Sequence, residues 1–309
     1  MSLDTPENYI RSMTPQLEGT VTASIEEYEA SEKLLNAHMR SLSRIFNFNV
    51  RVANNFQAKN NEMPPLYDMR KDHKHVPIGE ESNGPPQRSV CGGIISSNYR
   101  ISHFISSIIQ PIISEAEEPC TSTEDLLSRI DKLNESEDLD NCIIGSMDVS
   151  ALYPSIDIDF SVDRCVEMIQ DSDAKFDHIN VDELGLYLSL CANSIIEQDL
   201  YRLCPTWKRK GKRPTITTCG TESNEKRRWQ CWNKSEIKPS PVEERKMICY
   251  ALGITMKTTL KNHIFQFNEQ IRKQENGGAI DVKAAGDIAG LFMICGTRRY
   301  RHEALCSLC

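Results

Sequence analysis

Hydrophobic positions recur at helical spacing along most of the chain. Between about Thr22 and Phe48, apolar residues three or four positions apart alternate with glutamates, which predicts an amphipathic helix. The same spacing predicts further helices at about 97–115, 121–133, 157–172, 181–197, 242–262 and 281–295. Pro111 lies inside the segment 97–115, and its missing backbone N–H predicts an interruption there. The pattern therefore indicates a helix-rich chain.

Polar residues at two predicted helix starts suggest specific caps. Thr121 and Glu124 have the spacing of a capping box. Asp157 and Asp159 begin the segment 157–172, where a negative charge stabilises the positive end of a helix. We expect both aspartates to act as caps.

Two short apolar runs predict strands between these helices. Residues 142–147 are followed by Asp148 and then by turn residues at Pro154 and Ser155. The run from His263 to Phe267 precedes a Gly-Gly turn. The stretch 54–84 is polar and predicts an extended loop or hairpin, whereas 205–241 contains all 3 tryptophans among basic clusters and is interpreted as a long insertion.

Composition agrees with a folded chain and gives no global nucleic-acid signature. The 309 residues suit one large or two modest domains, and the net charge is −8. A cleft can still be locally basic, because binding depends on the local potential. The sequence shows no secretory leader and no apolar run near the roughly 20 residues of a membrane span. We therefore expect an intracellular protein, nuclear or cytoplasmic, without a membrane partner.

Asp148 is the strongest candidate for chemistry. It ends a buried strand and precedes a turn that carries Tyr153. Mg²⁺ or Mn²⁺ takes hard oxygen ligands and is shared between carboxylates and substrate phosphates, so an aspartate at this place suits a metal site. The plain alternative is an aspartate that only caps the turn.

Several segments together resemble the reverse transcriptase domain, most closely that of Penelope-like retroelements. Residues 65–74 and 85–90 resemble its two fingers segments, the Asp148 strand resembles its catalytic aspartate strand, and residues 265–280 resemble its segment with a Phe-Asn strand, a Gln and a Gly-rich turn. The resemblance spans about residues 62–293 in the family's order. It implies an α+β, helix-rich right-hand polymerase with an N-terminal helical region (1–49), fingers (50–117) and a partial palm (118–309) that contains a basic insertion at about 205–241.

The resemblance implies RNA-directed DNA synthesis by a retrotransposon enzyme, with a template, a primer and deoxynucleoside triphosphates as partners. Asp148 would be the catalytic metal ligand, and Tyr153 would pack under the sugar of the incoming nucleotide. The other implied nucleotide-binding residues are Lys71, Lys74 and Arg88 at the triphosphate, and Gln274, Gly277 and Gly278 near the template and nucleotide. Each assignment has a plain alternative. The basic residues could belong to a solvated loop, Tyr153 could be packed on the palm, and the Gly-Gly turn could be part of an ordinary hairpin.

Two departures from the family pattern bear on activity. The family's aromatic-x-Asp-Asp hairpin has no counterpart before Cys309, and Asp281 stands where the family usually has glycine. We therefore expect a truncated gene or a decaying copy. Two alternatives stay open: a fragment similar to family B DNA polymerases, whose D-x-x-S-L-Y-P-S motif differs here at Ala151, and a non-catalytic nucleic-acid-binding remnant. The clusters 208–213 and 226–228 predict phosphate contacts, a nuclear-import signal or a solvated loop.

Overall fold

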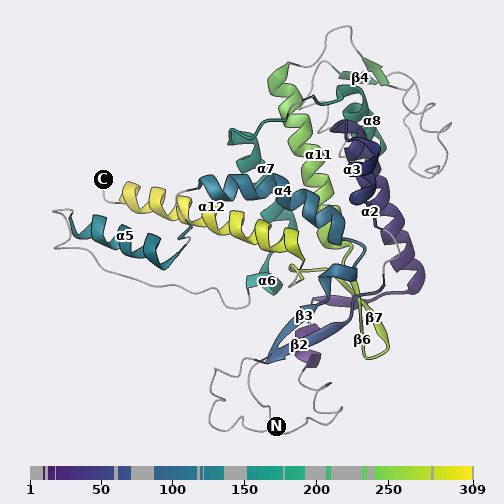
Figure 1. Ribbon diagram of the computed structural model, residues 1–309, viewed down its shortest axis with the longest axis horizontal. Coiled ribbons are helices and arrows are strands. Elements are labelled where there is room, and N and C mark those ends of the chain that lie inside the picture. The colour runs from purple at the N-terminus through teal and green to yellow at the C-terminus, as the bar shows by residue number, and fades with distance from the viewer. Residues whose placement is uncertain are drawn as a thin grey trace.

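The structure is a computed structural model in which helices dominate, with short antiparallel sheets beside them (Figure 1). It describes residues 10, 13–17, 19–58, 62–70, 87–116, 119–120, 122–135, 152–176, 178–191, 207–209, 232–234, 240–279 and 282–307. The helix-rich α+β class expected from the sequence is thus observed.

Most of the longer α-helices begin and end close to the predicted limits. The last helix continues to Ser307, beyond its predicted end at residue 295, and the two short helices Val50–Asn55 and Leu152–Ser155 were not predicted. The bounds of the α-helices are α2 (Ile25–Ile45), α3 (Val50–Asn55), α4 (Tyr99–Glu115), α5 (Thr123–Asn134), α6 (Leu152–Ser155), α7 (Ile158–Asp171), α8 (Val181–Cys191), α11 (Pro241–Lys261) and α12 (Lys283–Ser307), with short 3₁₀ helices at Thr14–Leu17 and Gly93–Ile95. Capping boxes start α2 at Ser24 with Glu27, and α11 at Ser240 with Glu243. Such reciprocal bonds satisfy backbone N–H groups that the helix itself leaves unpaired.

One hydrophobic core joins α2, α4, α7, α8, α11 and α12. Leu42, Ile105, Val162, Leu188 and Leu252 represent five of these helices and are almost completely buried. α11 lies among the others, with α7, α4 and α12 on one side and α2 and α8 on the other (Figure 1). The predicted N-terminal helix therefore belongs to the same core as the segments that follow it.

The strands in the described part of the chain form three small antiparallel sheets. Their bounds are β1 (Thr20–Thr22), β2 (Leu66–Arg70), β3 (Gln87–Cys91), β4 (Trp207–Arg209), β5 (Trp232–Lys234), β6 (Ile264–Phe267) and β7 (Gln270–Gln274). The sheet orders are β1-β7-β6, β2-β3 and β4-β5. A bridge from Pro65 to Gln266 connects the first two, and Met13, Cys91, Phe265 and Phe267 form a second small core there. The hairpin expected in the polar stretch 54–84 is formed in part by β2, whose partner β3 follows that stretch.

Arg245 of α11 caps the C-terminal end of α7. Its guanidinium donates to four backbone carbonyls and lies 5.5 Å from the ring centroid of Phe176. The acceptors are the carbonyl oxygens of Ile169, Gln170, Ser172 and Ala174. Helix ends leave carbonyls without intrahelical partners, so this side chain replaces water at the end of α7.

Three local predictions were wrong. α4 continues through Pro111, because the apolar residues on either side, Ile109 and Ile112, are both held in the core. The cap of α5 is Ser122, whose Oγ accepts from the backbone N–H of Asp125; Thr121 lies outside the described residues.

The third wrong prediction concerns the start of α7. Asp157 is its cap and accepts from the backbone N–H of Phe160, as expected. Asp159 is no cap: it pairs with Lys261 at 2.6 Å and with Lys257 at 3.5 Å. Those lysines lie on α11, so only the packing of two helices brings them to Asp159.

Candidate functional site

The structure describes five of the eight residues predicted for the nucleotide site. Asp148, Lys71 and Lys74 lie outside the described residues, as does Asp281. Arg88 is placed through its backbone, in β3 opposite Met69. The geometry of the site therefore comes from Tyr153 and from the segment 274–278. Of the basic clusters in the insertion, only the backbone of 208–209 is described.

The Tyr153 turn and the Gly-Gly turn meet directly. The backbone N–H of Gly278 donates to the carbonyl oxygen of Tyr153 at 2.7 Å. Gly277 has a φ of +75°, and a Cβ there would lie 2.6 Å from the carbonyl oxygen of Pro154. Only glycine fits both the backbone conformation and this distance. The close approach that glycine permits here is to the backbone of α6.

The ring of Tyr153 lies between the Gly-Gly turn and the start of α12. Its Cδ1 is 3.9 Å from the position that a Cβ on Gly278 would take, and its hydroxyl oxygen is 3.5 Å from that position on Gly286. The side chain is partly buried against the main core. Figure 1 shows α6 beside the start of α12. The tyrosine thus packs on the protein while part of it stays accessible.

Gln274 and its neighbours hold the Gly-Gly turn in place. The side-chain Nε2 of Gln274 donates to the carbonyl oxygen of Asn276, within the turn. The backbone N–H groups of Glu275 and Asn276 donate to the carbonyl oxygen of Gly19 at 3.0 and 3.1 Å. Gly19 precedes β1, which pairs with β7. Sequence reasoning missed β1, since its three residues have no distinctive pattern.

A polar cluster next to this site was also missed. Asp287, on α12, is only 7% exposed; its Oδ1 accepts from the side-chain amide of Gln110, and its Oδ2 has no hydrogen-bond partner among the described residues. Burial and the neighbouring Lys283 lower the pKa of His103, while Asp287 raises it. The available signal was a single acid within the apolar run 284–289. Burying a carboxylate costs free energy unless it is paired or hydrogen-bonded, so Asp287 marks a place in the core where polar side chains gather.

The described residues supply no metal centre of their own. Among them, no three His, Cys, Asp or Glu side chains are grouped so that they could hold an ion. Within the same part of the chain, no helix has both the length and the apolar character needed to cross a bilayer. A scan against family models, a search of curated proteins and a search of solved structures gave no match.

Proposed function

We propose that this chain is the reverse transcriptase domain of a retroelement, related to the Penelope-like group. The observation that carries the proposal is the contact between the Tyr153 turn and the Gly277–Gly278 turn. The family resemblance assigns both turns to the incoming nucleotide, and they are far apart in the sequence. Their direct contact is what a shared nucleotide site requires.

The proposed reaction is template-directed nucleotidyl transfer. The primer 3′-hydroxyl oxygen bonds to the α-phosphorus of a deoxynucleoside triphosphate, and the bond to the pyrophosphate oxygen breaks. Asp148 would hold Mg²⁺ or Mn²⁺, for which a carboxylate oxygen is an apt ligand and which supplies charge neutralisation at the phosphates. Lys71, Lys74 and Arg88 would neutralise the triphosphate. Catalysis would come from positioning and electrostatics, with no covalent intermediate on the protein.

Tyr153 would control which sugar is accepted. Its side chain packs against the main core, and its ring lies near the Gly-Gly turn and Gly286, which restricts the directions in which it can move. A bulky side chain held in this way beside the sugar would exclude a 2′-hydroxyl by steric conflict. The proposed specificity is therefore for deoxynucleotides.

Primer extension on an RNA template tests the proposal. Wild-type protein is incubated with Mg²⁺, primer–template and each nucleotide, next to Asp148→Ala and Tyr153→Ala. We expect Asp148→Ala to abolish incorporation and Tyr153→Ala to raise the use of ribonucleotides relative to deoxynucleotides. Nucleotide incorporation by the Asp148→Ala variant would contradict the assignment of Asp148 as a metal ligand.

A binding measurement covers the case in which no extension is seen. Template-dependent binding of a labelled deoxynucleoside triphosphate is measured in the presence of Mg²⁺ and then again for Tyr153→Ala. Binding that is template-dependent and lost in the variant supports the nucleotide site. Binding of primer–template alone, with no nucleotide selectivity, would instead support the non-catalytic nucleic-acid-binding alternative.

A further inference from the structure

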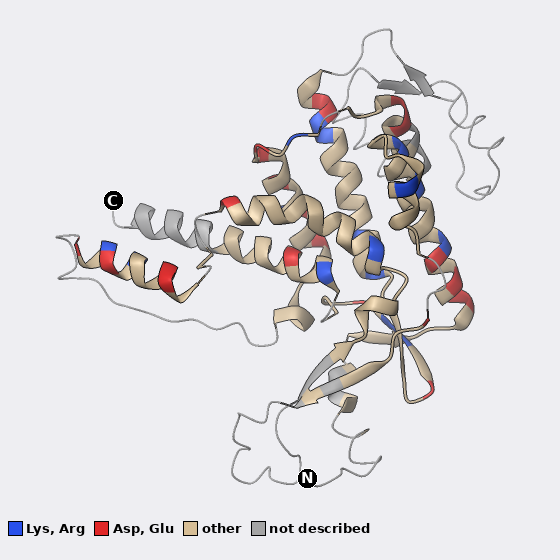
Figure 2. Cartoon of the chain, viewed as in Figure 1, with Lys and Arg blue, Asp and Glu red and all other residues tan. Residues whose placement is uncertain are grey.

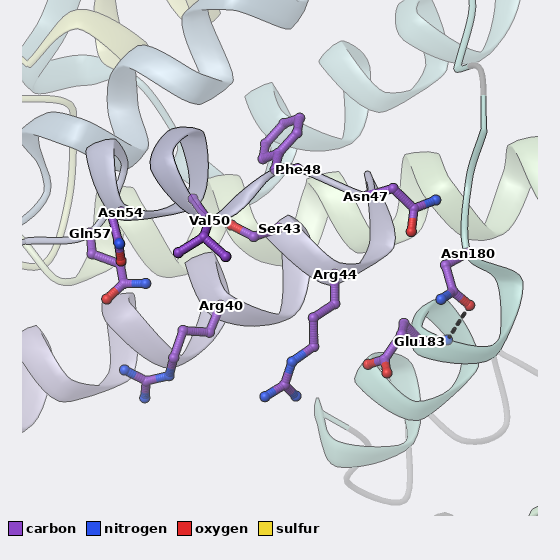
Figure 3. Close-up of a pocket in the computed structure, with 11 residues that line it drawn as sticks. Arg40, Ser43, Arg44, Asn47, Phe48, Val50, Asn54, Gln57, Asn180 and Glu183 are labelled. Atoms are coloured by element: carbon purple, nitrogen blue, oxygen red, sulfur yellow. Dashed lines mark hydrogen bonds between the residues drawn. The ribbon is translucent and has the colours of Figure 1, made fainter.

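A polar groove lies on the face of the core away from the Gly-Gly turn, between the C-terminal half of α2, α3 and the start of α8 (Figure 3). Its volume is about 480 Å³. The lining residues are mostly polar: Arg40, Ser43, Arg44, Asn47, Asn54, Gln57, Asn180 and Glu183, with Phe48, Val50 and Ala53. Its surface includes apolar as well as polar atoms, so the arginines and the amides would orient a ligand that also makes apolar contacts.

The charges of the groove favour an anion. Arg40 and Arg44 are one helical turn apart on α2, and both side chains leave the helix on the same side (Figure 3). Glu183 is the one carboxylate among the described lining residues. Figure 2 shows that α2 carries its acids at the N-terminal end and its arginines near the groove. This distribution also suits the helix dipole, and it places two arginines beside the groove.

Two of the lining amides are held in fixed orientations. The Oδ1 of Asn180 accepts from the backbone N–H groups of Asp182 and Glu183, each at 3.2 Å, so its NH₂ group remains as the donor. The Nδ2 of Asn47 donates to the carbonyl oxygen of His178, so its Oδ1 remains as the acceptor. The groove therefore offers donors and acceptors in fixed places beside two arginines.

Phe48 forms a wall of the groove rather than a stacking platform. Its ring packs against Phe46, Phe56 and Phe104, with centroids 5.8 to 5.9 Å apart. A ring engaged in this way is poorly placed to stack on a base. A ligand in the groove is thus recognised through its charged backbone, with little dependence on base identity.

We infer that this groove binds the sugar–phosphate backbone of single-stranded nucleic acid, with Arg40 at a phosphate. The choice of nucleic acid over an acidic peptide rests on the proposed function, because a polymerase must hold its template strand. Amides that offer both donors and acceptors also suit sugar and phosphate oxygens better than carboxylates alone. Binding should be strongly salt-dependent, since neutralising phosphates releases counterions.

Fluorescence anisotropy with a labelled single-stranded oligonucleotide of mixed sequence tests the inference, over a series of salt concentrations. For Arg40→Ala we expect several-fold weaker binding and a plot of log K against log salt that is shallower by about 0.7, the value for one phosphate contact on a single strand. Asn54→Ala should weaken binding without changing that slope. The matched control is Lys33→Ala, which removes an exposed cation of the same helix that pairs with Glu29 outside the groove.

Equal slopes for Arg40→Ala and Lys33→Ala would overturn the inference, provided that circular dichroism shows both variants folded. A polyglutamate peptide that displaces the oligonucleotide and depends equally on Arg40 would assign the groove to an acidic protein partner instead. The two proposals fail separately. If the protein shows no nucleotide selectivity but Arg40→Ala still weakens oligonucleotide binding, the polymerase proposal is wrong and the groove proposal stands. If nucleotides are incorporated but Arg40→Ala has no effect on binding, the groove proposal is wrong and the polymerase proposal stands.

Discussion

The helical core and the contact between the two turns are stabilised in different ways. In the core, side chains from six helices share the burial, and a change at one position can be absorbed by movement of its neighbours. At the turns, Gly277 lies against backbone atoms of Pro154, which cannot move aside as a flexible side chain can. The comparison teaches that the candidate site is the less tolerant region, although it buries far less apolar surface.

Acid should destabilise the protein through two buried histidines, neither of which belongs to the two turns. His38, bonded through Nδ1 to the Tyr187 hydroxyl at 2.7 Å, and His263, whose Nδ1 lies 3.0 Å from the amide nitrogen of Asn98, are both buried. Burial lowers the pKa of each to about 4, from an ordinary value of 6.5. The unfolded chain therefore binds protons that the folded chain rejects, and stability present above pH 6.5 is lost as the pH falls toward 4.

Urea unfolding at neutral and acidic pH measures this loss. Between pH 7 and about pH 4.5, the two histidines together should lower the free energy of unfolding by roughly 5 kcal/mol. His38→Gln should remove about half of the loss, because glutamine can hydrogen-bond to Tyr187 but does not titrate. His178→Asn, at an exposed position, is the control. An acid loss that is the same in all three proteins would show that other groups cause it.

Gly277→Ala is the sharpest test of the turn contact. The new Cβ would meet the carbonyl oxygen of Pro154 at 2.6 Å, at a backbone φ of +75°. We expect the free energy of unfolding to fall by roughly 3 kcal/mol, from backbone strain together with the clash. Gly296→Ala is the matched control, because nothing lies within 4 Å of its Cβ position; it should be neutral or slightly stabilising. Equal effects of the two substitutions would contradict the close backbone contact.

Arg245→Ala should destabilise the core less than Gly277→Ala destabilises the turn. The substitution leaves four carbonyls at the end of α7 without their donor. Water can reach part of this region, so we expect a loss of about 2 kcal/mol in the free energy of unfolding. Arg245→Lys keeps the charge but not the planar fork, and it should recover less than half of the loss. Full recovery by lysine would mean that charge, rather than the fork of hydrogen bonds, closes the helix.

Gly253→Ala should have the smallest effect and completes the comparison. A Cβ at Gly253 of α11 would lie 2.8 Å from Cγ2 of Val166, a distance nearly as short as that at Gly277. Here the obstacle is the end of a side chain on α7, and alanine is also the better helix former. We expect a net loss of about 1 kcal/mol or less in urea unfolding. A loss as large as that of Gly277→Ala would show that the core is as rigid as the turns.

Most helices and one strand were predictable because their signals are local. The limits of α2, α7, α11 and β6 fall within a few residues of those expected. Caps such as Asp157 act within one turn, and amphipathic spacing extends over a single helix. The fate of Pro111 was not predictable in this way, since the helix persists through packing against distant segments.

The candidate site also has features that local sequence predicts and features that depend on packing between distant segments. The sequence by itself determined the candidate residues, because Asp148, Tyr153 and the Gly277–Gly278 turn stand out by residue type and spacing. Only the tertiary structure decided that Pro154 lies against Gly277, that Asp287 is buried beside Gln110, and that α2, α3 and α8 enclose a groove. Each of these is a contact between segments far apart in the chain. Local propensity carries no information about such contacts, since they form only when the helices bury their apolar faces together.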